Sequence, residues 1–583
     1  MKKFFKLLKA IAGWLLLALL IVAAVFALAA GIINRHPLAE GLGLALFLGA
    51  LVAAAATLFL SLRWMCRGYG FRSTGIVFGG FAILFALFYA EENWRGGRAW
   101  QTFQAQSAAR GEKLDFASII PPPVPDEQNF ALSPVVASCY ADRLDKHGHR
   151  IDPPNTNVVN RLAMEINRDS DYDRQPTTGN WAKGTCTDLK SWQIYFRTPI
   201  TNSAKMLTND FPVAPSPQSP AADVLLALSK YDSTIEELRQ ASQLPFARFP
   251  INYNTENPFD SLLPHLMGTK QCVQSLRLRA EAELELGESA KALADIKLAF
   301  RMIDSMHQEP FLISHLVRIA ELSIILQPVY EGLAGHKWSD GELVELEREL
   351  ARLDFLADYQ LSMRGERNSS LSFIDHLRRH KDYRELVSAT TFDNAGGEDR
   401  IEWDKIVSTT FYAFIPTGWI YLNEVTIGEM HQRWTLPTND SSKHQIYPKV
   451  AQAADQVLGS LQTTPWNIFA KIVMPALTFA EQKFGFAQSA VDLARVAGAL
   501  ERYRLAHGEY PAALAAVTPT FIGALPPDVV GGEPLKYRRT EDGRFVLYSI
   551  GWNETDDGGK MALKQDGRPD NEHGDWVWQY PKK

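Results

Sequence analysis

The stretch "PHLMGTKQCVQSLRLRAEAELELGESAKALADIKLAFRMIDSMHQEP", residues 264–310, decides the fold of the central part of this chain. Its apolar residues recur every three or four positions, which is the period of a helix with one buried face. The pattern breaks at Gly287, resumes, and stops before Pro310; glycine and proline are the residues that most often end helices. The sequence therefore predicts two antiparallel helices joined by a tight turn.

A second helix pair is predicted directly after the first. Residues 312–333 and 339–353 keep the helical period, and Ser339 and Glu342 have the spacing of a capping box. Further apolar helices are expected within residues 402–434 and 449–479. We therefore predict a mainly α fold in which residues 221–479 form a helical array domain.

Four positions of the first pair resemble the consensus of the tetratricopeptide repeat: Leu286, Gly287, Ala290 and Ala299. The match covers one repeat unit of about 34 residues, and its proline arrives one position earlier than in the consensus. The resemblance implies a repeat-like array, and such arrays usually serve as surfaces that bind other proteins.

The amino-terminal 90 residues have the composition of a membrane region. Residues 10–33, 41–62 and 74–90 carry no charge, and each is near the length of about 20 residues that crosses a bilayer as a helix. Lysines precede the first segment and arginines separate the second from the third. By the positive-inside rule, these features predict a multi-pass protein of the inner (cytoplasmic) membrane with three spans in residues 1–90 and everything after them extracytoplasmic. A cleaved signal peptide ending near residues 27–29 is the alternative for the first segment, and it also exports the rest of the chain.

Two linking regions are expected between the membrane and the array. Residues 91–129 predict a stalk helix followed by a hinge, because "PPPVP" at 121–125 cannot be helical. Residues 130–220 are rich in Asn, Asp, Gly and Pro and predict irregular, loop-rich structure. Cys139 and Cys186 could form a disulfide in an oxidising compartment, and free buried thiols are the alternative.

Residues 480–583 predict a separate α+β module. A helix ending near Gly508 is followed by two alternating segments, 533–540 and 544–551, joined by a Glu-Asp-Gly turn at 541–543. The acidic loop "GWNETDDGG", 551–559, comes next.

This module is similar to the globular head of the major pseudopilin of type II secretion. The similarity rests on "LERYRLAHGEYP", "LPPDVVGGEPLKYR" and "YSIGWNETDDGG" with "GDWVW". Because that family binds calcium in its acidic loop, the resemblance implies calcium ligands at Asp556, Asp557 and Asp575. The insertion "KMALKQDGRP" departs from the family, and a solvated acidic turn is the alternative. The overall plan also resembles a group of uncharacterised, membrane-anchored bacterial envelope proteins, which supplies no function.

Other chemistry is weakly indicated. The 60 basic and 66 acidic residues are spread along the chain, which argues against a nucleic-acid partner. Nucleophile, phosphate-loop and zinc-protease motifs are absent from the sequence. His376 and His380 stand four apart and could share a metal, but the arginines in "DHLRRH" repel a cation, which favours a solvated helix face.

We therefore expect a membrane-anchored, exported scaffold of the bacterial envelope that binds a protein partner, with a link to secretion or transport and no cofactor other than calcium. The alternative is an exported hydrolase whose active site is not recognisable from sequence.

Overall fold

The computed structural model describes residues 70–140, 160–166, 176–198, 211–380, 415–462 and 464–581. The chain forms two compact units, Met1–Trp94 and Arg95–Lys583. Helices predominate in the described ranges, which confirms the mainly α prediction: α3 (Gly70–Ala109), α4 (Pro134–Ala137), α5 (Leu189–Arg197), α6 (Pro220–Leu228), α7 (Asp232–Ala241), α8 (His265–Glu285), α9 (Ser289–Ser305), α10 (Leu312–Ala334), α11 (Asp340–Leu350), α12 (Phe355–His380), α15 (Thr417–Met430), α16 (Pro448–Ser460), α17 (Ile468–Val473) and α18 (Pro475–His507). The strands are β1 (Asn439–Asp440), β2 (Gln445–Ile446), β3 (Lys536–Arg539), β4 (Phe545–Ser549), β5 (Met561–Leu563), β6 (Pro569–Gly574) and β7 (Trp576–Trp578).

Both predicted helix pairs of the array are confirmed. Helices α8 and α9 are separated by a short turn in which Gly287 has φ +79°, a backbone conformation that glycine adopts without strain. Helices α10 and α11 form the second pair. At the start of α11 the Ser339 side chain and the Glu342 side chain each accept a backbone N–H of the other residue, so the capping box is present.

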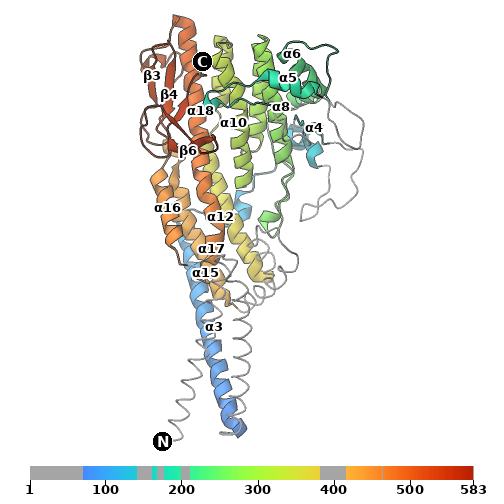
Figure 1. Ribbon diagram of the computed structural model, residues 1–583. Helices are drawn as coiled ribbons and strands as arrows, with labels where there is room; N and C mark the ends of the chain where they lie inside the picture. Colours follow the sequence, from blue (N-terminus) through green and yellow to red (C-terminus); the bar gives the residue numbers. More distant parts are fainter. Residues whose placement is uncertain are drawn as a thin grey trace. The chain divides into compact units, whose positions relative to one another are not determined.

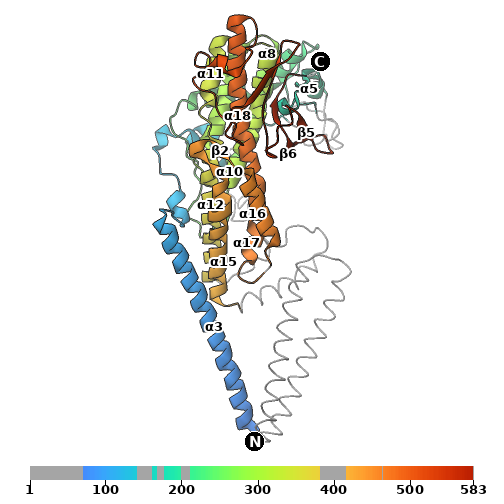
Figure 2. The same ribbon diagram turned by 90° about the vertical axis from the view of Figure 1, so that its left-hand side faces the viewer.

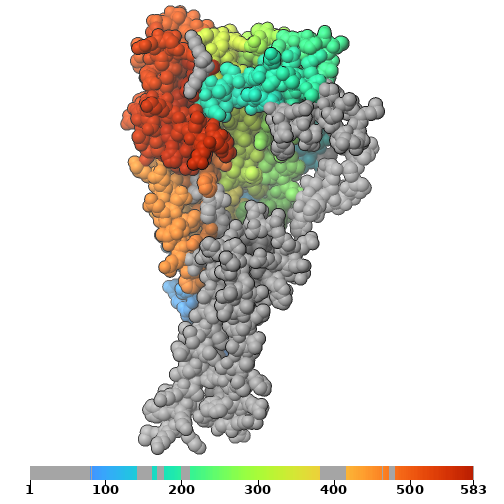
Figure 3. All heavy atoms as spheres, viewed as in Figure 1, coloured from blue at the N-terminus to red at the C-terminus, as the bar shows by residue number. Residues whose placement is uncertain are grey.

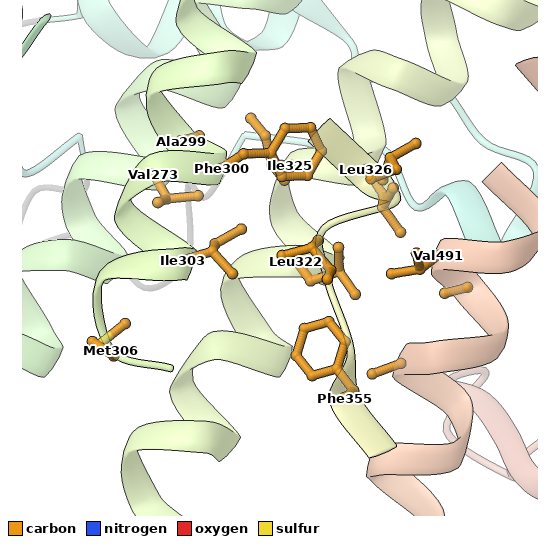
Figure 4. Close-up of a cluster of buried hydrophobic side chains, with 14 of the residues drawn as sticks. Val273, Ala299, Phe300, Ile303, Met306, Leu322, Ile325, Leu326, Phe355 and Val491 are labelled. Atoms are coloured by element: carbon orange, nitrogen blue, oxygen red, sulfur yellow. The ribbon is translucent and has the colours of Figure 1, made fainter. Parts of the chain in front are cut away.

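The main core of the second unit lies between these helices. Figure 4 shows side chains from α8, α9, α10, α12 and α18 meeting in one cluster. The labelled members are Val273, Ala299, Phe300, Ile303, Met306, Leu322, Ile325, Leu326, Phe355 and Val491. All of them are nearly inaccessible to solvent, so burial of apolar surface is the main force that holds the array together.

Helix α18 joins the predicted array to the predicted carboxy-terminal module. It runs for 33 residues alongside α10 and α12 and also contacts α11 (Figures 1 and 2). Its Phe484 and Leu500 belong to the main core, as do Leu547 of β4 and Trp578 of β7. The boundary expected at 479/480 therefore falls inside one helix, and the residues on its two sides share a core.

The predicted hairpin is present at the carboxy-terminal end. Strands β3 and β4 pair antiparallel with Arg539 opposite Phe545, and Gly543 in the turn has φ +77°. Strand β7 adds to the other edge of β4, and β5 pairs with β6 in a second sheet. The ring centroids of Trp578 and Trp181 are 5.6 Å apart. Figure 3 shows the carboxy-terminal residues in red beside the teal segment around α5.

The part of α3 that belongs to the second unit, where a stalk helix was predicted, packs closely on α15. A Cβ on Gly96 would overlap the carbonyl group of Gly418, and a Cβ on Gly428 would overlap the Phe103 ring. The proline-rich run that follows is not helical, as predicted. It does not separate the stalk from the domain, because Phe116 before it packs on Phe311 in the main core.

The described parts of the region 130–220 are mostly irregular, as predicted, with helix α5 as the main exception. Helix α5 begins at an Asp188 cap, whose carboxylate accepts the N–H groups of Lys190 and Ser191. Its Trp192 and Phe196 form a second core cluster with α6 and α8. The disulfide considered between Cys139 and Cys186 is not formed, since both residues are free cysteines.

The first two predicted membrane spans, 10–33 and 41–62, lie outside the described residues. The third, 74–90, lies within α3. By length and composition, α10 is the one helix found in the searched part of the described chain that could cross a bilayer, and 61% of its most apolar window is buried inside the protein. Its apolar residues contribute to the main core.

Candidate functional site

The predicted calcium loop is organised around Asp575. This residue lies between β6 and β7 and is 1% exposed. Its Oδ1 accepts the N–H of Asp557 at 3.2 Å, while its Oδ2 accepts the N–H groups of Gly559 at 2.6 Å and Lys560 at 3.3 Å. Three backbone donors therefore satisfy this carboxylate, which ties the acidic loop to the sheet.

The other two predicted ligands have separate partners. Asp556 Oδ1 accepts the Gly558 N–H and the Tyr548 hydroxyl, each at 3.0 Å, and these two bonds hold the pKa of Asp556 below its usual range. Asp557 Oδ2 accepts the side-chain amide of Asn553 at 3.1 Å. The calcium site remains a prediction.

Two other groups of His, Asp and Glu side chains bring three donor atoms within 4.8 Å of one another in the described part of the chain, and neither includes the three aspartates of the acidic loop. The first group is Glu256, His376 and His380. The second is Asp570, Glu572 and His573, which lie within four consecutive positions of β6.

The first group joins α12 to the long connection between α7 and α8. Oε2 of Glu256 lies 3.1 Å from Nδ1 of His376 and 2.7 Å from Nε2 of His380. The two imidazole rings are neighbours on the helix, with centroids 4.5 Å apart. The four-residue spacing of the histidines indicated two of the three members of this group. Glu256 is 120 residues from His376 in the sequence, and no sequence signal pointed to it.

A buried chain of hydrogen bonds crosses the array near α8. The Tyr140 hydroxyl lies 2.6 Å from Nδ1 of His265, whose Nε2 lies 2.9 Å from Oε1 of Glu309. The Ser314 hydroxyl donates to Oε2 of the same glutamate. Burial raises the pKa of Tyr140. His265, Glu309 and Ser314 are all buried, so the chain satisfies interior polar groups and offers no reaction site open to solvent.

Six glutamates of the described chain have raised pKa values, the property that would favour a hydrolase. Burial is the main cause at each one. It raises the pKa of Glu366 to about 7, that of Glu481 well above its usual range, and those of Glu281, Glu283, Glu321 and Glu424 to about 8. None of the six lines the cavity found between α10, α18, β4 and β7, which has a volume of about 10 Å³, the room of about one water molecule. The glutamates therefore do not assemble around a substrate-sized space there.

The described structure thus contains two candidate sites. One is the acidic loop held by the Asp575 carboxylate, and the other is the group of Glu256, His376 and His380, which come from distant segments. Comparisons of the chain with protein-family models, with curated proteins and with solved structures found no match, so its function is inferred from its own residues.

Proposed function

We propose that this chain is a multi-pass protein of the inner membrane whose exported helical domain binds a protein partner in the cell envelope. In this proposal residues 74–90 of α3 are the third membrane span. The α8–α9 pair is tetratricopeptide-like, and the α+β part after it is a head of the pseudopilin type with a link to secretion or transport.

The observation that carries the proposal is the apolar surface of α3. In the described part of this segment the large side chains of Ile83, Leu84, Phe85, Leu87 and Phe88 are all exposed, by 44 to 63%. Consecutive positions of a helix point to all its sides, so this segment is apolar all round. Removing five such side chains from water stabilises a protein by about 7–15 kcal/mol in total, at about 1.5–3 kcal/mol each. The hydrocarbon core of a bilayer provides an apolar environment in which these side chains are removed from water.

The flanking aromatic residues support the same placement. Tyr89 lies near the end of the apolar run, and Trp94, which is 63% exposed, lies four residues after the last residue of the run, Ala90. Tryptophan and tyrosine gather where a membrane helix meets the headgroups. After the apolar run, the next charged residue of α3 is Glu91, so the apolar segment ends where an interface would lie.

A topology reporter tests the membrane part. We expect alkaline phosphatase fused after Lys583 to be active, because this enzyme needs disulfides that form outside the cytoplasm. The double variant Leu84→Arg/Leu87→Arg should lose that activity, since two arginines near a span centre oppose insertion by about 5–7 kcal/mol. The matched variant Leu84→Phe/Leu87→Phe should keep it. An inactive fusion of the unaltered chain, with a fluorescent cytoplasmic reporter at the same position, would refute the exported placement.

The partner is tested by photo-crosslinking in cells from exposed positions on the array, such as Met267 of α8 and Ile313 of α10, which are 63% and 52% exposed. One dominant envelope protein captured at such positions and lost after a charge substitution beside them supports the scaffold function. The absence of crosslinks from a panel that covers the array would favour the alternative, an exported hydrolase.

A further inference from the structure

We propose that Glu256, His376 and His380 form a binding site for a divalent transition-metal ion of the zinc class. The site has no part in the membrane placement or in the scaffold function. It would fasten the connection between α7 and α8 to helix α12.

The donor atoms already stand near the separations that such an ion requires. With Zn–N and Zn–O bonds of about 2.0–2.2 Å and tetrahedral angles, neighbouring ligand atoms lie about 3.4 Å apart. Oε2 of Glu256 is 3.1 Å and 2.7 Å from the two histidine nitrogens, and all three donor atoms lie within 4.8 Å of one another. Two of the three separations are therefore within about 0.7 Å of the tetrahedral value, and the third is at most 4.8 Å.

The two arginines beside the histidines both pair with one neighbouring carboxylate, which offsets part of their charge. Asp375 accepts a hydrogen bond from the Arg378 guanidinium through Oδ1 and pairs with Arg379 through Oδ2 at 2.8 Å. Arg378 also lies over the Tyr421 ring, 5.0 Å from its centroid. The repulsion expected from "DHLRRH" is thus offset by a carboxylate on the same helix, and Glu256 contributes a further negative charge.

The connection that carries Glu256 is held in place on both sides. Before it, the buried Tyr253 ring stacks on Phe311 at 5.9 Å. After it, the Asn257 side chain accepts the Phe259 N–H at 3.1 Å, and the Phe259 ring meets Phe373 of α12 edge-on at 5.9 Å. Glu256 therefore reaches the histidines from a backbone that is anchored by packing, and ion binding would order only a few side-chain torsions.

The donor set selects the ion. Two imidazoles and one carboxylate suit zinc, cobalt, nickel and copper, whereas calcium and magnesium prefer sites made of oxygen alone. Three protein ligands leave at least one position for water, and the site is open to solvent because the Glu256 and His380 side chains are 58% and 47% exposed.

The second group, Asp570, Glu572 and His573, is the natural control. Its donors come from one exposed stretch of β6, and His573 is 70% exposed with a hydrogen-bond contact to Asp570 at 3.0 Å. All three of its members belong to β6 alone. The variant His573→Ala lacks one histidine, as His376→Ala and His380→Ala do, but it keeps all three ligands of the proposed site.

The test is equilibrium dialysis of the purified full-length chain in detergent micelles against Zn²⁺, with bound metal measured by mass spectrometry. We expect one equivalent for the unaltered chain and for His573→Ala. Binding to His376→Ala, His380→Ala and Glu256→Ala should be weaker by about tenfold to 100-fold or more, since even outer-shell changes cost that much. Loss of zinc from His573→Ala with retention in the other three variants would overturn the proposal.

A second measurement does not depend on the folding of any variant. Co²⁺ added to the unaltered chain should give the intense visible absorption of a four-coordinate ion with nitrogen ligands, and excess Zn²⁺ should bleach it. Ca²⁺ at the same concentration should not. Cobalt spectra that remain those of the hydrated ion would overturn the site.

Discussion

Breaking the ion pair between Arg318 and Asp358 should destabilise the helical unit far more than removing both partners together. Arg318 lies on α10 and is 1% exposed, and its guanidinium donates to Asp358 of α12. It also donates to the Ile303 carbonyl at 2.7 Å and to Nδ1 of His315 at 3.2 Å. Burial and the nearby guanidinium lower the pKa of His315 to about 3, so this ring is neutral and can accept.

The magnitude follows from what each substitution leaves behind. Removing one partner of a buried pair costs about 3–5 kcal/mol, because the other charge stays buried without compensation. Asp358→Ala should fall near 3 kcal/mol, since two acceptors remain for Arg318. Arg318→Met leaves a buried carboxyl that must be protonated, so its cost should rise with pH by about 1.4 kcal/mol per pH unit. The double variant Arg318→Met/Asp358→Leu should be within about 1 kcal/mol of the unaltered chain, because apolar residues of similar size can replace a buried pair.

The assay is thermal unfolding of the full-length chain in micelles, followed by tryptophan fluorescence. For a cooperative unit as long as Arg95–Lys583, 1 kcal/mol corresponds to about 1 °C in Tm. Asp358→Ala should therefore lower Tm by about 3 °C and the double variant by about 1 °C or less. The exposed pair of Lys297 and Glu345, whose charged atoms are 2.7 Å apart, provides the control, and its removal should shift Tm much less. Equal losses in the single and double variants would refute the reasoning.

Three further predictions concern other parts of the second unit. Gly365→Ala in α12 should lower the free energy of unfolding by about 1–3 kcal/mol, because the new Cβ would overlap the Pro310 carbonyl. Gly341→Ala in α11 should raise it by about 0.5–1 kcal/mol, because the new Cβ meets nothing within 4 Å. Both changes are read from Tm, and equal shifts would contradict the packing argument. Burial raises the pKa of Glu424 from 4.5 to about 8 in the folded chain, so its contribution to stability is complete below about pH 4.5 and is lost as the pH rises towards 8. Glu424→Gln should flatten the fall in the free energy of unfolding over that window by about 1.4 kcal/mol per pH unit. An unchanged slope would show that the residue is not protonated in the folded chain. Asp575→Asn should cost about 2–4 kcal/mol by weakening three charge-assisted bonds, which is read from Tm. A drop in the Tm of the unaltered chain on addition of a calcium chelator would establish the calcium site, and an unchanged Tm would favour the solvated acidic turn.

Local structure was readable from the sequence wherever neighbouring residues determine it. The turn at Gly287, the capping box at Ser339 and the hairpin at Gly543 all appeared where they were predicted. Each depends on residues within a few positions of one another: a glycine that accepts positive φ, or a side chain that reaches the backbone three residues away. The mainly α content follows from the same local periodicity.

Tertiary structure decided how those elements are joined. From the sequence, α18 was assigned to a separate module because it directly precedes the carboxy-terminal strands. In the structure it also packs against α10, α11 and α12 and contributes to the main core. The part of α3 after its apolar segment was predicted to be a stalk, because no local sequence signal indicates that Gly96 packs against Gly418. The sequence likewise did not indicate which backbone groups bind Asp575 or that Glu256 lies beside His376. Helical periodicity tells which face of an element is buried, but not against what, because contacts between residues far apart in sequence depend on the packing of the whole core.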